Sequence, residues 1–286
     1  MIEVYDRKNN KIIKEKTPKG ANFLYKSFLG RIILSLANKR FISIIVGWYL
    51  NRRISKIHIK RFIKDNNIDM SDYPEVRYKS FNDFFSRKIK VNKRKFSTVE
   101  KNFCAPCDSR LIVYEIDENR EFEIKNKKYT VEELLRNKNL ALEYKDGYML
   151  VFRLSVCDYH RYSYIDNGVF IKSKKINGKF HTVGPVAFKR YKVFLENQRE
   201  YELYKTENFD RMIQMEVGAM MVGKIVNRKK KDFVRGEEKG YFLFGGSTVI
   251  ILVKNNILDI DKDILNNSKN GIETKVKLGE KIAKAR

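Results

Sequence analysis

From about residue 100 onward, apolar residues occur in short runs separated by Gly, Asn and Asp. Runs rich in Val, Ile, Tyr and Phe that are bounded by turn residues are typical of β-strands. The predicted strands are 110–116, 148–154, 168–176, 212–217, 220–226, the two runs on either side of residue 247, and a final strand at 273–282. Thr130 and Glu133 have the spacing of a capping box, which predicts a short helix over 130–135.

The first hundred residues have a helical period instead. Apolar residues recur at near-helical spacing at Phe23, Leu24, Phe28, Leu29, Ile32, Ile33 and Leu36, and residues 21–68 are predicted to form two or three helices. Phe81, Phe84 and Phe85 fall on one helical face, as core residues do. We therefore predict an α+β protein in which N-terminal amphipathic helices (1–98) precede a β-rich, barrel- or sandwich-like core (99–286).

Charge is distributed unevenly along the chain. The 60 Lys and Arg residues against 35 Asp and Glu give a formal charge of +25. Twelve of the basic residues, and no acidic one, lie between Lys16 and Lys64. The apolar run 41–50 has ten residues, whereas a membrane-spanning helix needs about 20. A basic helix carrying Trp48 and Tyr49 is suited to an anionic headgroup boundary. Ordinary packing on its own domain, and nucleic-acid binding, are the alternatives.

Cysteine usage favours a reduced, intracellular protein, because there are three cysteines and no N-terminal signal pattern. A zinc site is an alternative interpretation, since Cys104-x-x-Cys107 and Cys157-x-x-His160 supply suitable ligand types at suitable spacing. A thioredoxin-like cysteine pair is less favoured, because no helix start follows Cys107.

The segment Gly245-Gly246-Ser247-Thr248 interrupts two apolar runs. Glycines allow a sharp turn and a close approach to the Gly246 carbonyl. The Ser247 hydroxyl could attack that carbonyl and convert the amide into an ester, provided that a base removes its proton. The alternative is a glycine bulge in a core strand, with a capping serine.

Several segments, in the expected order from about Phe81 to the C-terminus, together resemble the phosphatidylserine decarboxylase family. They are Phe81-Asn82-Asp83-Phe84-Phe85-Ser86-Arg87, Pro106-Cys107-Asp108, Asp158-Tyr159-His160-Arg161, Gly178 to Pro185, Val217 to Gly223, Arg235-Gly236-Glu237-Glu238 and Phe244-Gly245-Gly246-Ser247-Thr248.

The resemblance implies self-cleavage between Gly246 and Ser247, which gives a β chain of residues 1–246 and an α chain of residues 247–286. Ser247 then becomes a pyruvoyl group, a covalent cofactor that accepts the electrons released with carbon dioxide, so no metal and no external cofactor are expected. The implied substrate is phosphatidylserine in an anionic membrane, at the cytoplasmic face, with phosphatidylethanolamine as product and no nucleic-acid partner. A pyruvoyl decarboxylase of a soluble amino acid is the alternative enzyme, and it would leave the basic N-terminal helices without a task.

The resemblance also implies site residues. Asp108 corresponds to an acid that orients a histidine, and His160 to a histidine of the site. A second family histidine, three positions after the first, is replaced here by Ser163, which cannot act as a base. We expect His181 to deprotonate Ser247, oriented by Asp108, and His160 to protonate the substrate carbanion. The competing expectation is that His160 serves both steps. His58, among basic residues, is expected to be solvated.

Overall fold

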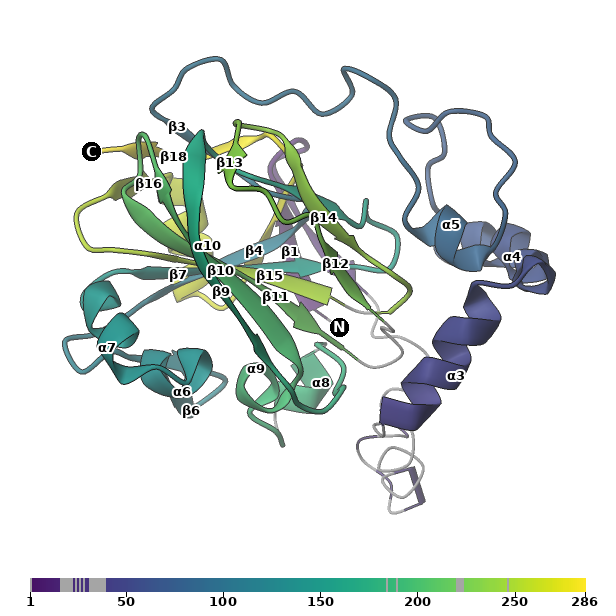
Figure 1. The fold of residues 1–286 in the computed structure, drawn as a ribbon, viewed down its shortest axis with the longest axis horizontal. Coiled ribbons are helices and arrows are strands. Elements are labelled where there is room, and N and C mark those ends of the chain that lie inside the picture. The colour runs from purple at the N-terminus through teal and green to yellow at the C-terminus, as the bar shows by residue number, and fades with distance from the viewer. Residues whose placement is uncertain are drawn as a thin grey trace.

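The computed structural model describes residues 2–15, 23, 25, 27, 29–30, 40–183, 185–188, 190–219, 224–245 and 247–286. A β-rich body makes up most of this part of the chain, and helices α3, α4 and α5 lie along one side of it (Figure 1). Ten described strands form one large sheet, in the order β13 (Asp232–Phe233), β9 (Gly168–Ile176), β10 (Arg199–Thr206), β11 (Arg211–Gly218), β15 (Ser247–Val253), β7 (Tyr148–Leu154), β4 (Ser109–Glu115), β17 (Glu273–Val276), β1 (Ile2–Asp6) and β2 (Lys11–Glu15).

Smaller elements cover the two faces of this sheet. One face carries the hairpin β5 (Glu121–Ile124) and β6 (Lys127–Thr130), with α6 (Val131–Leu135), α7 (Lys138–Ala141), η2 (Leu142–Tyr144), α8 (Pro185–Phe188) and α9 (Val193–Glu196). The other carries the sheets β12 (Ile225–Asn227), β14 (Glu238–Phe242), β8 (Arg161–Ser163) and β16 (Leu258–Ile260), β18 (Lys281–Ala285), β3 (Asn102–Cys104), with α10 (Lys262–Lys269).

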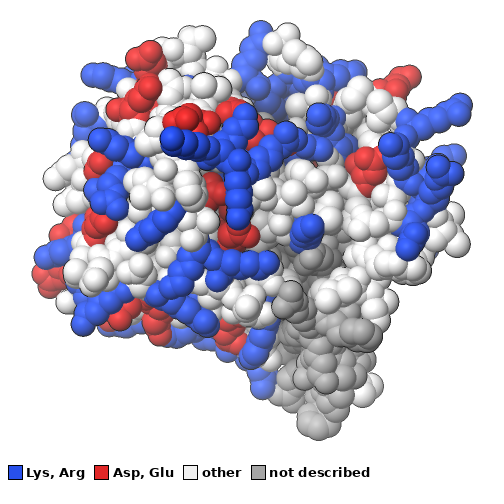
Figure 2. Space-filling model, viewed as in Figure 1, with Lys and Arg blue, Asp and Glu red and all other residues white. Residues whose placement is uncertain are grey.

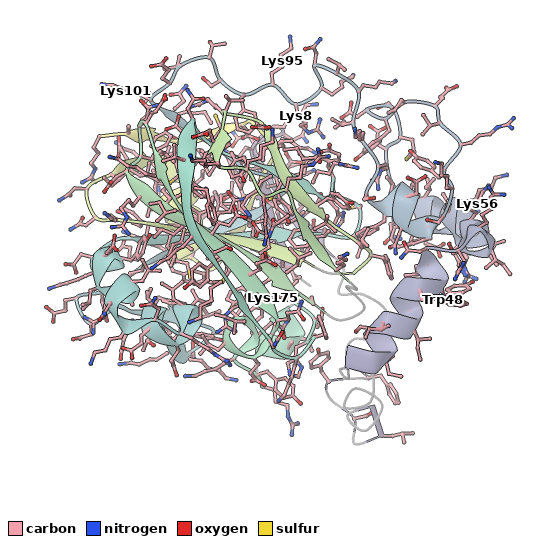
Figure 3. All side chains as sticks on the ribbon, in the orientation of Figure 1. Lys8, Trp48, Lys56, Lys95, Lys101 and Lys175 are labelled. Atoms are coloured by element: carbon pink, nitrogen blue, oxygen red, sulfur yellow. The ribbon has the colours of Figure 1, made fainter. Side chains whose placement is uncertain are left out.

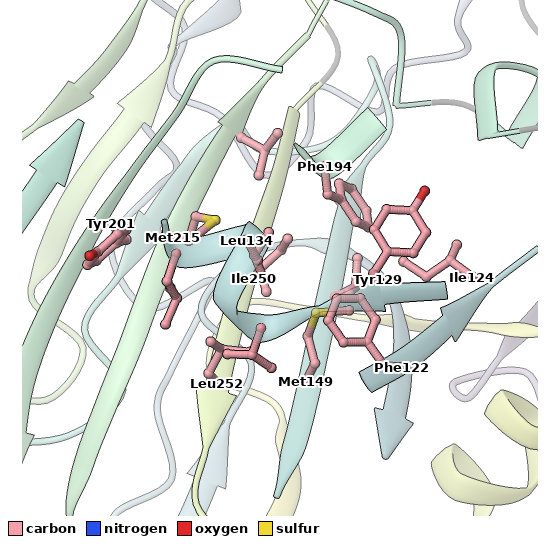
Figure 4. Close-up of a cluster of buried hydrophobic side chains, with 14 of the residues drawn as sticks. Phe122, Ile124, Tyr129, Leu134, Met149, Phe194, Tyr201, Met215, Ile250 and Leu252 are labelled. Atoms are coloured by element: carbon pink, nitrogen blue, oxygen red, sulfur yellow. The ribbon is translucent and has the colours of Figure 1, made fainter. Parts of the chain in front are cut away.

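Strand β15 lies at the centre of the large sheet, and all seven of its residues are buried. Ile250 and Leu252 point into the core on the helical face, which Figure 4 shows. Val249 and Ile251 point into the opposite core. Each fully buried side chain of this kind contributes about 1.5–3 kcal/mol. The result is a sandwich-like α+β fold, as predicted, whose sheets are not closed barrels.

Most predicted elements of the β-rich body are confirmed. β4, β7, β9, β11 and the strands around residue 247 lie within two residues of the predicted ranges. Thr130 Oγ1 accepts a hydrogen bond from Glu133 N (3.0 Å), and the Glu133 carboxylate accepts one from Thr130 N (3.2 Å), which confirms the capping box.

Two predicted strands differ from the structure. The single strand 273–282 is wrong, because a turn with Gly279 at φ +83° divides it into β17 and β18. An L side chain rarely adopts that conformation. Of the predicted strand 220–226, residues 220–223 lie outside the described residues, and β12 begins at Ile225.

The N-terminal part combines helices with an unpredicted hairpin. The helices are α3 (Arg40–Leu50), η1 (Arg53–Lys56), α4 (Ile57–Asp65) and α5 (Phe81–Phe85). The apolar stripe expected over 23–36 lies largely outside the described residues. Among the described helices, none has both the length and the apolarity that crossing a membrane requires. β1 and β2 were not predicted: β1 pairs in parallel with β17, so the chain's first residues complete the large sheet.

A group of buried charges lies between β8, β10, β11 and β14. The Lys239 ammonium donates to both carboxylate oxygens of Glu216 (3.0 Å each) and to Asn227 Oδ1 (3.0 Å). Glu202 lies 3.4 Å from the same nitrogen, so two buried carboxylates share one ammonium. Burial, together with the charge of Glu202, outweighs Lys239 and raises the pKa of Glu216 to about 7.

This shift predicts that the contribution of Glu216 to stability falls as pH rises. Between the ordinary value of 4.5 and about 7, the folded chain keeps a proton on Glu216 that the unfolded chain has lost. The contribution of Glu216 to the free energy of unfolding should therefore decrease by about 1–3 kcal/mol between pH 5 and pH 8. Glu216→Gln should remove this dependence in chemical denaturation, whereas Glu123→Gln, exposed on β5, should retain it. If the free energy of unfolding of Glu216→Gln varies with pH as it does in wild type, the proton assigned to Glu216 in the folded chain is refuted.

Candidate active site

Ser247 is the first residue of β15 and is fully buried. It pairs with Gly218 of β11 on one side and with Leu154 of β7 on the other. Its hydroxyl has no hydrogen-bond partner in the described part of the chain, which is unusual for a buried polar atom. Gly245, with φ at +141°, adopts a conformation that favours glycine, while Gly246 lies outside the described residues.

His160 lies just before β8, with its ring against Phe85 (centroids 4.0 Å apart). Its Nδ1 is 2.9 Å from the backbone oxygen of Asp158. A carbonyl oxygen can only accept, so Nδ1 carries the proton and Nε2 carries the lone pair. Nε2 is buried and has no partner among the described residues. Burial, helped by the charge of Arg87, lowers the pKa of His160 to about 3, so the ring is neutral near pH 7.

Helix α5 connects His160 to the segment that precedes Ser247. Phe85 contacts the His160 ring and also the Phe244 ring (centroids 5.2 Å apart). Asn82, on the same helix, accepts a hydrogen bond from Phe244 N (3.0 Å). Phe242 N donates to the backbone oxygen of His160 (2.9 Å). One short helix, capped by Ser80, therefore holds the histidine beside the approach to Ser247.

Asp108 is buried at the start of β4, but its carboxylate is occupied. Arg94 forms a two-pronged ion pair with it (2.8 and 2.7 Å), Lys277 Nζ lies 3.1 Å away, and Leu278 N donates at 2.8 Å. Burial alone would raise the pKa of Asp108, yet the Arg94 hydrogen bonds and the Lys277 charge bring it below its usual value. The contact that orients His160 comes from the Asp158 carbonyl, and Asp108 acts on that ring only through its charge.

His181 is linked through Asn197 to Gly218, the residue of β11 that pairs with Ser247. Its ring stacks on Tyr191 (centroids 4.0 Å apart), and its Nε2 is 3.4 Å from the Glu196 carboxylate. Burial lowers the pKa of His181, and Glu196 partly offsets this effect. Asn197 binds the backbone of His181 and also donates to Gly218 O (2.8 Å), the register partner of Ser247. The carboxylate beside His181 is thus that of Glu196, and the expected pairing with Asp108 does not match these contacts.

The other residues considered from the sequence, Ser163 and His58, lie apart from these contacts. Ser163 is buried in β8, where its N–H donates to the Pro106 carbonyl (2.9 Å). His58 is exposed and contacts the Tyr49 hydroxyl (2.8 Å). In the described ranges, no three His, Cys, Asp or Glu side chains gather as metal ligands would, and the cysteines are free thiols.

Sequence reasoning missed the residues that support the site. Asn82, Arg94 and Asn197 act through contacts to residues between 14 and 162 positions away, and no local pattern indicates such partners. Phe85 and Arg87 were named as part of a segment that carries the family resemblance, but the sequence assigned them no role in the site.

The His160 geometry predicts one tautomer over a wide pH range. In protein with nitrogen-15-labelled histidine, the His160 signal should show Nδ1 protonated, Nε2 unprotonated and no titration between pH 5 and pH 8, because the pKa is about 3. His160→Asn identifies the signal by its loss. A proton on Nε2, or a midpoint near the ordinary pKa of 6.5, would contradict this arrangement.

Comparison with known proteins agrees with the resemblance seen in the motifs. The family model described as phosphatidylserine decarboxylase matches residues 81–284. Phosphatidylserine decarboxylase proenzyme 2 of Clostridium acetobutylicum is 50% identical over 284 residues, covering 98% of each chain. The phosphatidylserine decarboxylase proenzymes of Clostridium botulinum and Clostridium tetani are 43% and 40% identical, with 99% of this chain covered and 99% and 98% of theirs. The chain is therefore a decarboxylase that belongs to the phosphatidylserine decarboxylase family.

Proposed function

We propose that this chain cleaves itself before Ser247 and that the resulting enzyme decarboxylates phosphatidylserine at a membrane surface. The observation that carries the proposal is the Ser247 hydroxyl, which is buried at the start of the central strand without a partner among the described residues. The segment before it is held by helix α5, on which the neutral His160 ring also packs. Family membership supplies the substrate class.

Self-cleavage requires transfer of the hydroxyl proton. As Ser247 Oγ bonds to the Gly246 carbonyl carbon, its proton passes to a base and then to the departing nitrogen of Ser247, which leaves an ester. Elimination from that ester breaks the Cα–H and Cβ–O bonds and releases the Gly246 carboxylate. Hydrolysis of the resulting dehydroalanine releases ammonia and leaves a pyruvoyl group at the N-terminus of residues 247–286.

The surroundings of Ser247 fit such a group. The buried position excludes bulk water, and within the described ranges no hydrogen bond to the Ser247 oxygen has to be broken. When present, the pyruvoyl group supplies an electron sink for decarboxylation. His160 Nε2 is a site where a proton can be held and returned to the substrate carbon, because an anion beside the ring raises its pKa.

The contacts support His160 as the base for cleavage, which was the competing expectation from the sequence. Its Nε2 lone pair is available and its ring rests on the helix that binds Phe244, whereas His181 Nε2 lies beside Glu196. Asp108 then acts as a positioning residue that fixes the turn near Leu278 and contributes charge.

Membrane binding is supported by the exposed face of α3 and the turn beyond it. The large apolar side chains exposed there are Ile42, Ile44, Ile45, Trp48, Ile54 and Ile57. Figure 3 labels Trp48, 59% exposed on α3, and Lys56 in the neighbouring turn. Figure 2 shows Lys and Arg side chains spread over the body and over the helical side. Apolar and basic groups together suit an anionic lipid surface, and we propose that it is the cytoplasmic face of the cell membrane.

Gel analysis tests the cleavage proposal. Wild-type protein should separate into chains of residues 1–246 and 247–286 and release carbon dioxide from phosphatidylserine, whereas Ser247→Ala should remain one inactive chain. His160→Ala should also stay uncleaved, because the base is lost, while His181→Ala should be processed. Cleavage of His160→Ala together with intact His181→Ala would instead assign the base to His181, and activity in an uncleaved preparation would refute the proposal.

Vesicle binding tests the membrane surface. Deletion of residues 1–64 would also remove β1 and β2 from the sheet, so point changes are required. Ile44→Ser with Trp48→Ser should weaken sedimentation with anionic vesicles by about tenfold or more, because both side chains are exposed on α3. Val91→Ser, at a site 88% exposed outside this surface, is the matched control. If Val91→Ser weakens vesicle binding as much as the double variant on α3 does, the membrane contact lies elsewhere.

A further inference from the structure

Arg87 is a buried cation that follows helix α5. Its side chain is 2% exposed, and its guanidinium lies over the rings of Tyr73 (4.3 Å) and Phe84 (4.8 Å). Aromatic faces attract a guanidinium, but they do not neutralise its charge.

The hydrogen bonds of Arg87 are few and long. Nη2 donates to the Tyr73 hydroxyl (3.3 Å) and to the Cys157 carbonyl (3.4 Å), and Nη1 donates to the Phe84 carbonyl (3.4 Å). Nε is buried and has no partner among the described residues. All three acceptors are neutral oxygens at the far end of the usual distance range.

Five other arginines that are buried or nearly buried have carboxylate or backbone partners. Arg94, Arg110, Arg153 and Arg161 each pair with carboxylates. Arg199 makes four bonds to backbone carbonyls, from 2.6 to 3.2 Å. No ion pair within the described ranges includes Arg87. A buried charge without a counter-ion is costly, so its retention points to an anion that binds there.

Arg87 also lies beside the candidate active site. Its Nη2 contacts the carbonyl of Cys157, and the carbonyl of the next residue, Asp158, orients His160. The His160 ring packs on Phe85, two positions before Arg87. Two unpartnered nitrogens, Arg87 Nε and His160 Nε2, thus belong to one buried neighbourhood.

We propose that, in the cleaved enzyme, Arg87 binds the phosphodiester of the lipid headgroup through its forked N–H donors. This inference rests on the proposed function. The substrate carboxylate is the less suitable partner, because a cation bound to it would stabilise the charge that must leave as carbon dioxide. Phe244 packs against Phe85 two residues before the proposed cleavage site, so cleavage would create a new chain end close to the helix that Arg87 follows.

Calorimetry on cleaved enzyme tests the assignment with two ligands. Glycerophosphoethanolamine carries the phosphodiester, and methoxyethylamine keeps the amine but lacks the phosphate. Wild-type enzyme should bind the phosphodiester about tenfold to a hundredfold more tightly, as expected for a charge-assisted pair. Arg87→Gln should abolish this preference without weakening methoxyethylamine binding. Lys88→Gln removes the same charge at the next, exposed position and should leave the preference intact.

Three results would overturn the assignment. Arg87→Gln could retain the phosphodiester preference, or it could weaken both ligands equally, which indicates only a structural role. Inorganic phosphate could bind wild-type enzyme as tightly as glycerophosphoethanolamine, which indicates a free-phosphate site.

If Arg87→Gln is not cleaved, Arg87→Lys serves instead. This variant keeps the positive charge without the forked donors, so it should lose part of the preference for the phosphodiester. An unchanged preference would refute binding through the forked donors. A wild-type chain that neither cleaves nor decarboxylates phosphatidylserine fails the proposed function itself and is recognised before any ligand is compared.

Discussion

The structure depends on the burial of one strand, β15, from both sides. Its apolar residues anchor two cores, and a position at the centre of the sheet leaves its first residue no access to bulk water. Ser247 is therefore held by strand pairing with Gly218 and Leu154, while its hydroxyl has no hydrogen-bond partner among the described residues. A rigid backbone with an unsatisfied nucleophile is a local conflict of the kind that folded proteins retain at functional sites.

Around this strand, the buried ionisable groups with a structural role differ in their partners from those proposed to take part in the reaction. Asp108 with Arg94, and Lys239 with Glu216, are buried charges with partners, and they fix turns and strands. His160 and Arg87 are different, because each keeps a buried nitrogen for which the described part of the chain supplies no partner. Arg87 follows α5 in the chain, and the His160 ring packs on Phe85 of α5, which also packs on Phe244. This short helix joins the candidate catalytic groups to the segment where we propose that the chain breaks.

Local patterns in the sequence were sufficient for most of the β-rich body. Apolar runs bounded by turn residues located β7 and β9, and a capping box located α6. They were insufficient where structure depends on distant partners. β1 became a strand because β17 offered an unpaired edge, and the interruption at Gly279 depends on its backbone conformation. The motifs indicated Ser247, His160 and Asp108 as candidates, but the Asp158 carbonyl on His160 and the Arg94 pair on Asp108 required coordinates.

We propose that the fold alone carries the machinery for breaking its own chain. The most direct measurement is the rate of cleavage of newly synthesised, purified chain at different protein concentrations. Because the serine, the base and the scissile carbonyl belong to one molecule, the account predicts first-order cleavage with a rate constant that does not change on dilution. A rate that rises with protein concentration, or that requires an added protein, would contradict it.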